Sequence, residues 1–126
     1  MSPLVECIPN FSEGRRKWVI EAIVSAIHKA DVHILDVSSD TDHNRTVVTF
    51  IGTPLAVEQG AFWGIAEAKK HIRLDEHDGV HPRIGAADVV PFVPLRGATM
   101  TDCVEIVHRL GVRVADELNL PVYFYE

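Results

Sequence analysis

Side chains able to do chemistry gather in two polar stretches of this chain, residues 38–45 and 72–88. Polar connections of this length are uncommon in a compact domain and are often functional. We expect the two stretches to line one cleft. They hold these carboxylate, imidazole, amide and guanidinium groups: Asp40, Asp42, His43, Asn44, Arg45, Asp75, Glu76, His77, Asp78, His81, Arg83 and Asp88.

His81 is the residue best suited to proton transfer. Pro82 follows it and disfavours the helical region for the residue before it, so the backbone of His81 is held extended and the direction of its ring is partly fixed. An unperturbed imidazole pKa of about 6.5 allows it to accept and return protons at neutral pH. A general base is the functional interpretation, and a loop histidine that caps neighbouring backbone is the structural one. The pattern alone leaves both open.

The charged neighbours have the same two interpretations. Arg83 could clamp a substrate carboxylate with its planar guanidinium, or it could bind its own loop to Asp88. Asp40 and Asp42 could contact a substrate, or they could form turns by accepting hydrogen bonds from nearby backbone. Residue type does not decide between binding and structure at these positions.

A metal site would need ligands at a recognisable spacing. Asp40, Asp42 and His43 could be combined with the 76–77 pair and His81, but the chain has no HExxH or EF-hand pattern. We therefore predict that it binds no metal. It also has no GxGxxG or GxxxxGK[ST] string, so nothing predicts a phosphate-binding loop.

The composition predicts one folded domain, residues 1–126. Hydrophobic residues make up 47% of the chain and charged residues 24%, which is unlike a disordered protein and sufficient for a core. The formal net charge of -6 argues against nucleic-acid binding, which needs a surplus of Lys and Arg. No apolar run approaches the ~18 residues of a membrane span, and the first residues form no signal peptide. Cys7 and Cys103 have no CxxC spacing, so we expect a reduced, cytoplasmic protein.

Hydrophobic periodicity predicts strands that alternate with helices. The order β-α-β-β-α-β-α-β indicates an α/β (α+β) sandwich, in which a mixed β-sheet carries about three helices and has ferredoxin-like character. Gly60 and Gly64, four apart in the second helix, predict a face that another backbone can approach closely. The expected strands are 4–8, 32–37, 46–51, 89–95 and 121–125, and the expected helices are 18–30, 54–71 and about 101–118.

Local signals place several of these boundaries. Thr53, followed by proline, is the expected N-cap of the second helix. Pro91 and Pro94 place their strand at a sheet edge or end, because neither residue can donate a hydrogen bond to a neighbouring strand. Strands 32–37 and 46–51 are expected to pair antiparallel.

Three sequence strings, in order along the chain, closely resemble the N-terminal subdomain of glutamate formiminotransferase. They are VECIPNFSEGR at 5–15, ILDVSSDTDHNRTVVTFIGTP at 34–54 and GVHPRIGAADVVPFVPL at 79–95. The resemblance covers essentially the whole chain. Three separate motifs in the right order are far more specific than a lone histidine, so the resemblance favours the functional interpretation of His81.

That resemblance implies an activity. The family moves a formimino group from N-formimino-L-glutamate to N5 of tetrahydrofolate in histidine degradation, and some relatives handle formyl groups. It implies tetrahydrofolate as co-substrate without a metal, and it assigns the catalytic base of the HPR motif to His81. Many members read GEHPR where this chain has Val80, so any role of that acidic residue is absent here. The residues that match the family's pocket are Asn10, Asp40, His43, Asn44, Arg45 and Arg83.

The resemblance also implies partners. The family enzyme has a second subdomain after this one, with the folate site between the two, so we expect a C-terminal formiminotransferase subdomain in cis or in trans. Family members form homodimers, which is the expectation here. The basic run 15–17 could meet the glutamate tail of folate or be a solvated helix start. A non-catalytic folate-binding or assembly subunit is the alternative function, and a metal hydrolase ranks third.

Overall fold

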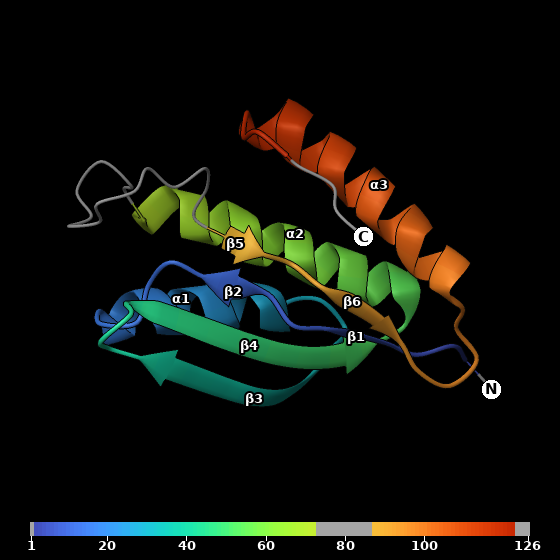
Figure 1. Cartoon of the computed structure of the whole chain (residues 1–126), viewed down its shortest axis with the longest axis horizontal. Helices are drawn as coiled ribbons and strands as arrows, with labels where there is room; N and C mark the ends of the chain where they lie inside the picture. Colours follow the sequence, from blue (N-terminus) through green and yellow to red (C-terminus); the bar gives the residue numbers. More distant parts are fainter. Residues whose placement is uncertain (1, 73–86, 123–126) are drawn as a thin grey trace.

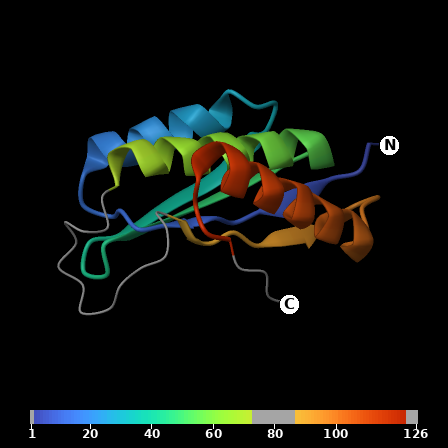
Figure 2. The same ribbon diagram turned by 90° about the horizontal axis from the view of Figure 1, so that it is seen from above.

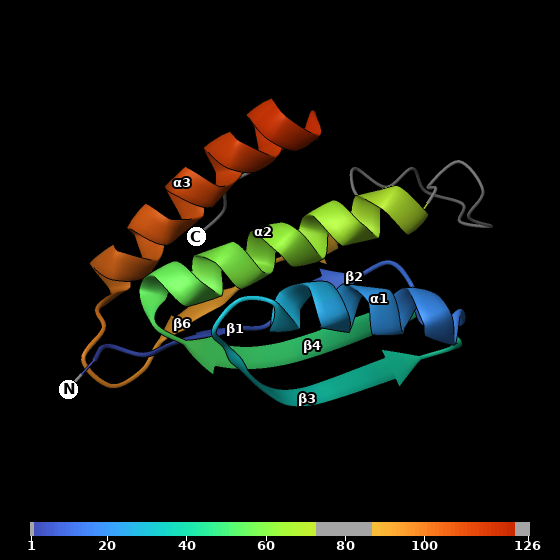
Figure 3. The same ribbon diagram turned by 180° about the vertical axis from the view of Figure 1, so that it is seen from behind.

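The chain forms a β-sheet with helices on one of its faces. The computed structural model describes residues 2–72 and 87–122. Figure 1 and Figure 3 show the sheet and its helices from opposite sides, and in Figure 2 α1 and α2 lie together above the sheet with α3 beside them. The elements are β1 (Val5–Cys7), β2 (Asn10–Phe11), α1 (Lys17–His28), β3 (His33–Asp40), β4 (Arg45–Gly52), α2 (Pro54–His71), β5 (Ala87–Val89), β6 (Phe92–Pro94) and α3 (Met100–Leu118).

The six strands occupy four positions across the sheet. β4 pairs with β3 on one side and with both β1 and β2 on the other, and β6 and β5 lie beyond β1 and β2. β1 and β2 together form one strand position that is interrupted at Pro9, and β5 and β6 form another that is interrupted at Pro91. Proline has no N–H to donate, so it breaks the ladder of hydrogen bonds. Across the interruptions, the backbone N–H of Ile8 donates to the carbonyl of Pro91, and that of Val48 donates to the carbonyl of Pro9, each at 3.1 Å. The divided strands therefore remain part of one sheet.

The predicted fold class is confirmed. The strand order β3, β4, β1/β2, β5/β6 is that of a split β-α-β arrangement, the ferredoxin-like character expected from the sequence. The sequence suggested a mixed sheet, whereas every described pairing is antiparallel, including the expected pairing of β3 with β4. Of the strand expected at 121–125, Pro121 and Val122 are not in a strand, and the remaining positions lie outside the described residues.

The core lies between the sheet and the helices α1 and α2. Phe11, Phe50 and Ile27 are fully buried there. Gly64 allows the two helices to approach, because a Cβ at this position would lie 2.8 Å from Cγ1 of Ile27. The close packing predicted from the two glycines is confirmed. At its start, α2 is capped as predicted, with the Thr53 hydroxyl accepting from the N–H of Ala56 at 3.4 Å.

The third helix packs across α2 and against β6. Arg109 donates through Nε to Oε1 of Glu58 at 2.9 Å, joining α3 to α2. Arg113 lies over the ring of Phe62, with its guanidinium carbon 3.8 Å from the ring centroid. The helix begins in a capping box, in which the side chain of Thr99 and that of Asp102 accept from each other's backbone N–H. None of the described helices is long and apolar enough to cross a membrane.

Candidate functional site

The turn between β3 and β4 is organised by Asp40. Its Oδ1 accepts from the backbone N–H groups of Asp42 at 3.0 Å and His43 at 3.2 Å. Its Oδ2 lies 2.6 Å from Nδ1 of His43. These bonds, first of all the one from the His43 ring, hold the pKa of Asp40 below its usual value. Asp40 therefore forms the turn, as one of its two interpretations predicted, and the same bonds fix the direction of the His43 imidazole.

Asn44 and Gly14 fasten this turn to the loop before α1. Asn44 has a left-handed backbone, with φ of 52°, and its Oδ1 accepts from the N–H of Gly14 at 2.8 Å. Gly14 lies so close to the turn that a Cβ there would be 2.4 Å from the carbonyl oxygen of Asp40 and 2.5 Å from the amide nitrogen of Arg45. Only glycine fits this contact without moving the backbone.

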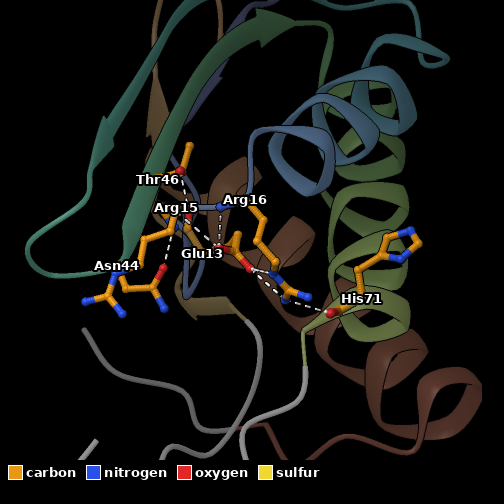
Figure 4. A network of polar contacts seen from close by, with 7 residues as sticks. Glu13, Arg15, Arg16, Asn44, Thr46 and His71 are labelled. Carbon is orange, nitrogen blue, oxygen red and sulfur yellow. Dashed lines mark hydrogen bonds and ion pairs between the residues drawn. The ribbon is translucent and has the colours of Figure 1, made fainter. Parts of the chain in front are cut away.

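Glu13 is a buried carboxylate at the centre of the same loop (Figure 4). The residue is 2% exposed, and its Oε2 accepts from the N–H groups of Arg15 at 3.2 Å and Arg16 at 3.0 Å. Its Oε1 accepts from Nε of Arg16 at 2.7 Å. Burial by itself would raise the pKa of this carboxyl, but the bonds from Arg16 and Arg15 outweigh burial and hold its pKa below the usual value. The hydroxyl of Thr46, on β4, donates to the backbone carbonyl of Glu13.

Arg16 extends the network to the end of α2. Its Nη2 lies 2.7 Å from Oε1 of Glu13 and also donates to the backbone carbonyl of His71 at 2.9 Å. The ring of His71 packs edge-on against Trp18, with centroids 5.1 Å apart, and its Nε2 lies 3.1 Å from the carboxylate of Glu67. Arg16 thus satisfies a terminal carbonyl of α2, where a cation is also favoured by the helix dipole.

The other two basic residues of the run 15–17, Arg15 and Lys17, face a different surface. Arg15 donates through Nε to the carbonyl of Thr41 at 2.9 Å. Arg15 and Lys17 border an open groove of about 740 Å³ between α1 and β3, which has Ile20 and Val37 among its lining residues. The run 15–17, treated as one cationic triplet in the sequence, is therefore divided between a groove and an internal ion pair.

Residues 4–126 match the family described as formiminotransferase domain, N-terminal subdomain. The chain belongs to this family. It is 50% identical over 123 residues to the glutamate formimidoyltransferase of Thermoplasma acidophilum, covering 97% of this chain and 41% of that protein. It is 42% identical over 127 residues to the glutamate formimidoyltransferase of Streptococcus pyogenes serotype M1, and the match covers 100% of this chain and 42% of that protein. Identity to the formimidoyltransferase-cyclodeaminase of Mus musculus is 48% over 126 residues, and the match covers 99% of this chain and 23% of that protein.

These matches confirm the resemblance predicted from the three motifs, and they make the chain homologous to transferase enzymes. The chain spans about two fifths of the length of the glutamate formimidoyltransferases it matches, and less than a quarter of the mouse protein. The relatives therefore contain further polypeptide beyond the region that corresponds to this subdomain.

Within this formiminotransferase subdomain, strand register brings three predicted site residues to one face. Asn10 is paired with Val47, and Asp40 is paired with Arg45. Paired residues share a face, as do residues two apart on one strand, so Asn10, Asp40 and Arg45 lie on the same side of the sheet. Phe11, next to Asn10, is buried under the helices, so this side is the one opposite α1 and α2. The Asn10 amide donates to the carbonyl of its neighbour Ile8 at 3.2 Å.

His81 and Arg83 lie outside the described residues, as does most of the second polar stretch. The turn that carries His43 and Asn44 connects β3 and β4 at the end of the sheet where β2 lies. Among residues 2–72 and 87–122, no group of three or more His, Cys, Asp and Glu side chains could hold a metal ion.

Sequence reasoning missed the network of Glu13, Gly14, Arg16 and Thr46. The one signal for a larger role was the string NFSEGR, which belongs to the first of the three family motifs. The partners of the loop residues lie in the β3–β4 turn, in β4 and in α2, so no local pattern could have identified them.

Proposed function

We propose that this subdomain is the N-terminal half of a folate-dependent transferase that moves a formimino group from N-formimino-L-glutamate to N5 of tetrahydrofolate, in histidine degradation. The observation that carries the proposal is 50% identity across 97% of the chain to a glutamate formimidoyltransferase. His81 is the proposed general base, and tetrahydrofolate is a co-substrate in a reaction that uses no metal. The proposed substrate-binding residues are Asn10, Asp40, His43, Asn44, Arg45 and Arg83.

Transfer of the formimino group needs a residue that moves protons more than it needs one that activates the formimino carbon. A protonated formimino group has an electrophilic carbon, so the step requires a free lone pair on N5 of tetrahydrofolate. His81 takes the proton from N5 as the new N–C bond forms, and it returns a proton to the glutamate nitrogen as the old C–N bond breaks. The number of protons is unchanged over the cycle, which suits a single imidazole titrating near neutral pH.

Charged groups would hold the two substrates during this exchange. An arginine such as Arg83 or Arg45 pairs with a glutamate carboxylate, for which a guanidinium is well shaped. Asp40 stabilises the cationic amidinium. The His43 ring beside it lowers the pKa of Asp40, so the negative charge that would face the amidinium is favoured.

The proposal includes a partner for this half. Because the chain spans 41% of the length of the archaeal relative, we propose that a C-terminal formiminotransferase subdomain, in cis or in trans, completes the folate site. We also propose that the assembled protein is a cytoplasmic homodimer. The alternative function is a non-catalytic folate-binding or assembly subunit, which the same partial coverage supports.

The test is a transfer assay with the C-terminal subdomain present, either in one chain or added separately. Formation of 5-formiminotetrahydrofolate is followed by absorbance, and binding of 5-formyltetrahydrofolate is followed by calorimetry. We expect His81→Ala to lower kcat by about 10²- to 10⁴-fold, the usual size of a general-base contribution. His33→Ala, an exposed histidine on β3, is the matched control and should retain full activity.

Two results would contradict different parts of the proposal. Binding of 5-formyltetrahydrofolate with no turnover in any combination would support the non-catalytic alternative. Full activity in His81→Ala would leave the transferase proposal standing but remove His81 as its base.

A further inference from the structure

The segment 10–16, which is β2 and the loop after it, contacts described residues on both sides of positions 73–86, among which His81 falls in the sequence. On one side, Phe11 is paired with Ala87, the first residue of β5. On the other side, Arg16 donates to the carbonyl of His71, the last residue of α2. The loop also holds the β3–β4 turn, through the bond from Gly14 to Asn44 and the bond from Thr46 to Glu13. This one short segment therefore contacts the start of β5, the end of α2 and the β3–β4 turn.

We propose that Glu13 and Arg16 are positioning residues for the transfer reaction. Their ion pair sets the end of α2 at a fixed place relative to the turn that carries Asp40, His43 and Asn44. This inference rests on the proposed function, because it assigns a role in that reaction to residues that contact no reacting atom.

The hydrogen bonds of the Glu13–Arg16 ion pair fix the positions of both side chains. Both oxygens of Glu13 are occupied, Oε2 by two backbone N–H groups and Oε1 by the guanidinium. The guanidinium of Arg16 in turn bonds to Glu13 and to His71 at once. A planar guanidinium can hold two acceptors in fixed directions, whereas the single ammonium of lysine is a point charge on a flexible stem.

Stabilisation of the folded state does not by itself explain why a buried ion pair is present here. Removing a carboxylate from water is costly, and buried ion pairs can often be replaced by apolar residues without loss of stability. Glu13 is 2% exposed, so it bears most of this cost. In some proteins a buried polar or ionic group instead specifies one arrangement of the elements that it joins.

The chain offers a matched control for this pair. Glu58 and Arg109 form a second carboxylate–guanidinium pair, with Glu58 8% exposed and an N–O distance of 2.9 Å. That pair joins α2 to α3 and contacts neither the loop 10–16 nor the β3–β4 turn. Arg16→Lys and Arg109→Lys therefore make the same chemical change in two similar ion pairs. Only the pair of Arg16 belongs to the loop that is bonded to the β3–β4 turn.

The experiment measures kcat, KM and the unfolding midpoint of the full-length transferase, or of this subdomain together with its second subdomain. For Arg16→Lys we expect kcat to fall at least about 10-fold while the KM values change less than about threefold, since misplacement of reacting groups by ~1 Å can cost about 100-fold in rate. Arg109→Lys, with a similar loss in midpoint, should retain kcat within about twofold. Glu13→Gln should behave like Arg16→Lys, because its amide nitrogen would face donors in either orientation, the guanidinium or the two backbone N–H groups.

A second measurement tests the same role if the variants above fold poorly. Arg16→Ala is assayed with added guanidinium ion, which should restore part of kcat, whereas guanidinium should not increase kcat in Arg109→Ala. Equal kcat in Arg16→Lys and Arg109→Lys, or absence of any selective rescue, would overturn the positioning role. A wild-type protein that shows no transfer would instead overturn the proposed function itself, so the two failures are distinguishable.

Discussion

Arg16 donates a hydrogen bond of 2.9 Å to the backbone carbonyl of His71, 55 residues further along the chain. The bond joins the residue before α1 to the last residue of α2. Because the carbonyls of the last helical turn have no partner within the helix, this bond satisfies a group that would otherwise face water. The same guanidinium is held by the buried Glu13, so the end of α2 is fixed relative to the interior of the subdomain.

Gly14→Ala should be strongly destabilising. The added Cβ would lie 2.4 Å from the carbonyl oxygen of Asp40 and 2.5 Å from the nitrogen of Arg45, and both are backbone atoms held in the β3–β4 turn. Overpacking against atoms that cannot yield costs about 3 kcal/mol or more, which urea denaturation measures as a lower midpoint at unchanged slope.

Gly52→Ala is the control for that substitution. Its added Cβ would be 3.2 Å from a side-chain atom of Val32 and 3.3 Å from the backbone oxygen of Asp31, so its neighbours need to shift by only a few tenths of an ångström. We expect a loss of no more than about 1 kcal/mol. Equal losses at positions 14 and 52 would contradict the close contact between Gly14 and the turn.

Glu13→Gln should reduce stability at neutral pH and lose its effect in acid. The pKa of Glu13 is below its usual value in the folded protein, so the ionised carboxylate stabilises the fold above the unfolded pKa of about 4.3. That stabilisation is lost as the pH falls through the folded pKa. We expect a difference in unfolding free energy of about 1.5–3 kcal/mol at pH 7, the range for hydrogen bonds to a charged group, and a smaller one below about pH 4.

Denaturation of both proteins across this pH range gives the difference directly. Glu117→Gln, which removes an exposed ion pair with Arg113, should change stability by no more than about 0.5 kcal/mol. A difference for Glu13→Gln that stays constant from pH 7 to pH 3 would mean that the charge on Glu13 does not contribute.

Thr99→Ala should cost more than Thr53→Ala. Thr99 begins α3 in a reciprocal capping box, with bonds of 2.8 and 3.1 Å, whereas the single cap bond of Thr53 is 3.4 Å. Losing an N-cap typically costs about 1 kcal/mol, so we expect about 1–2 kcal/mol at Thr99 and about 0.5 kcal/mol at Thr53. Thermal or urea unfolding ranks the two, and the opposite order would contradict these cap geometries.

The two cysteines should be unreactive in the native protein. Cys7 and Cys103 are buried free thiols, and burial raises the pKa of both, which disfavours the reactive thiolate. We expect a thiol reagent such as DTNB to modify neither at pH 8 until urea unfolds the chain, when both should react. Rapid reaction of either thiol in the absence of urea would show that the core opens locally.

Local information in the sequence predicted most of the fold. The three helices follow from apolar spacing, the start of α2 follows from Thr53 and its proline, and the positions of Pro9 and Pro91 explain why two strands are interrupted. These are properties of segments, since helix caps, periodicity and the missing N–H of proline act within a few residues. The order of these segments was sufficient to predict a ferredoxin-like sheet.

The tertiary structure alone decided how the candidate site is held together. Asn10, Asp40 and Arg45 were candidates from the sequence, but it is strand register that brings them to one face, and a register shift of one residue would place them on opposite sides. The bonds from Gly14 to Asn44 and from Arg16 to His71 span 30 and 55 residues. No periodic pattern extends over such distances, because these contacts depend on how the sheet and helices pack. For that reason the sequence could name candidate residues, whereas only the fold showed the buried Glu13 and its arginine joining the loops that carry them.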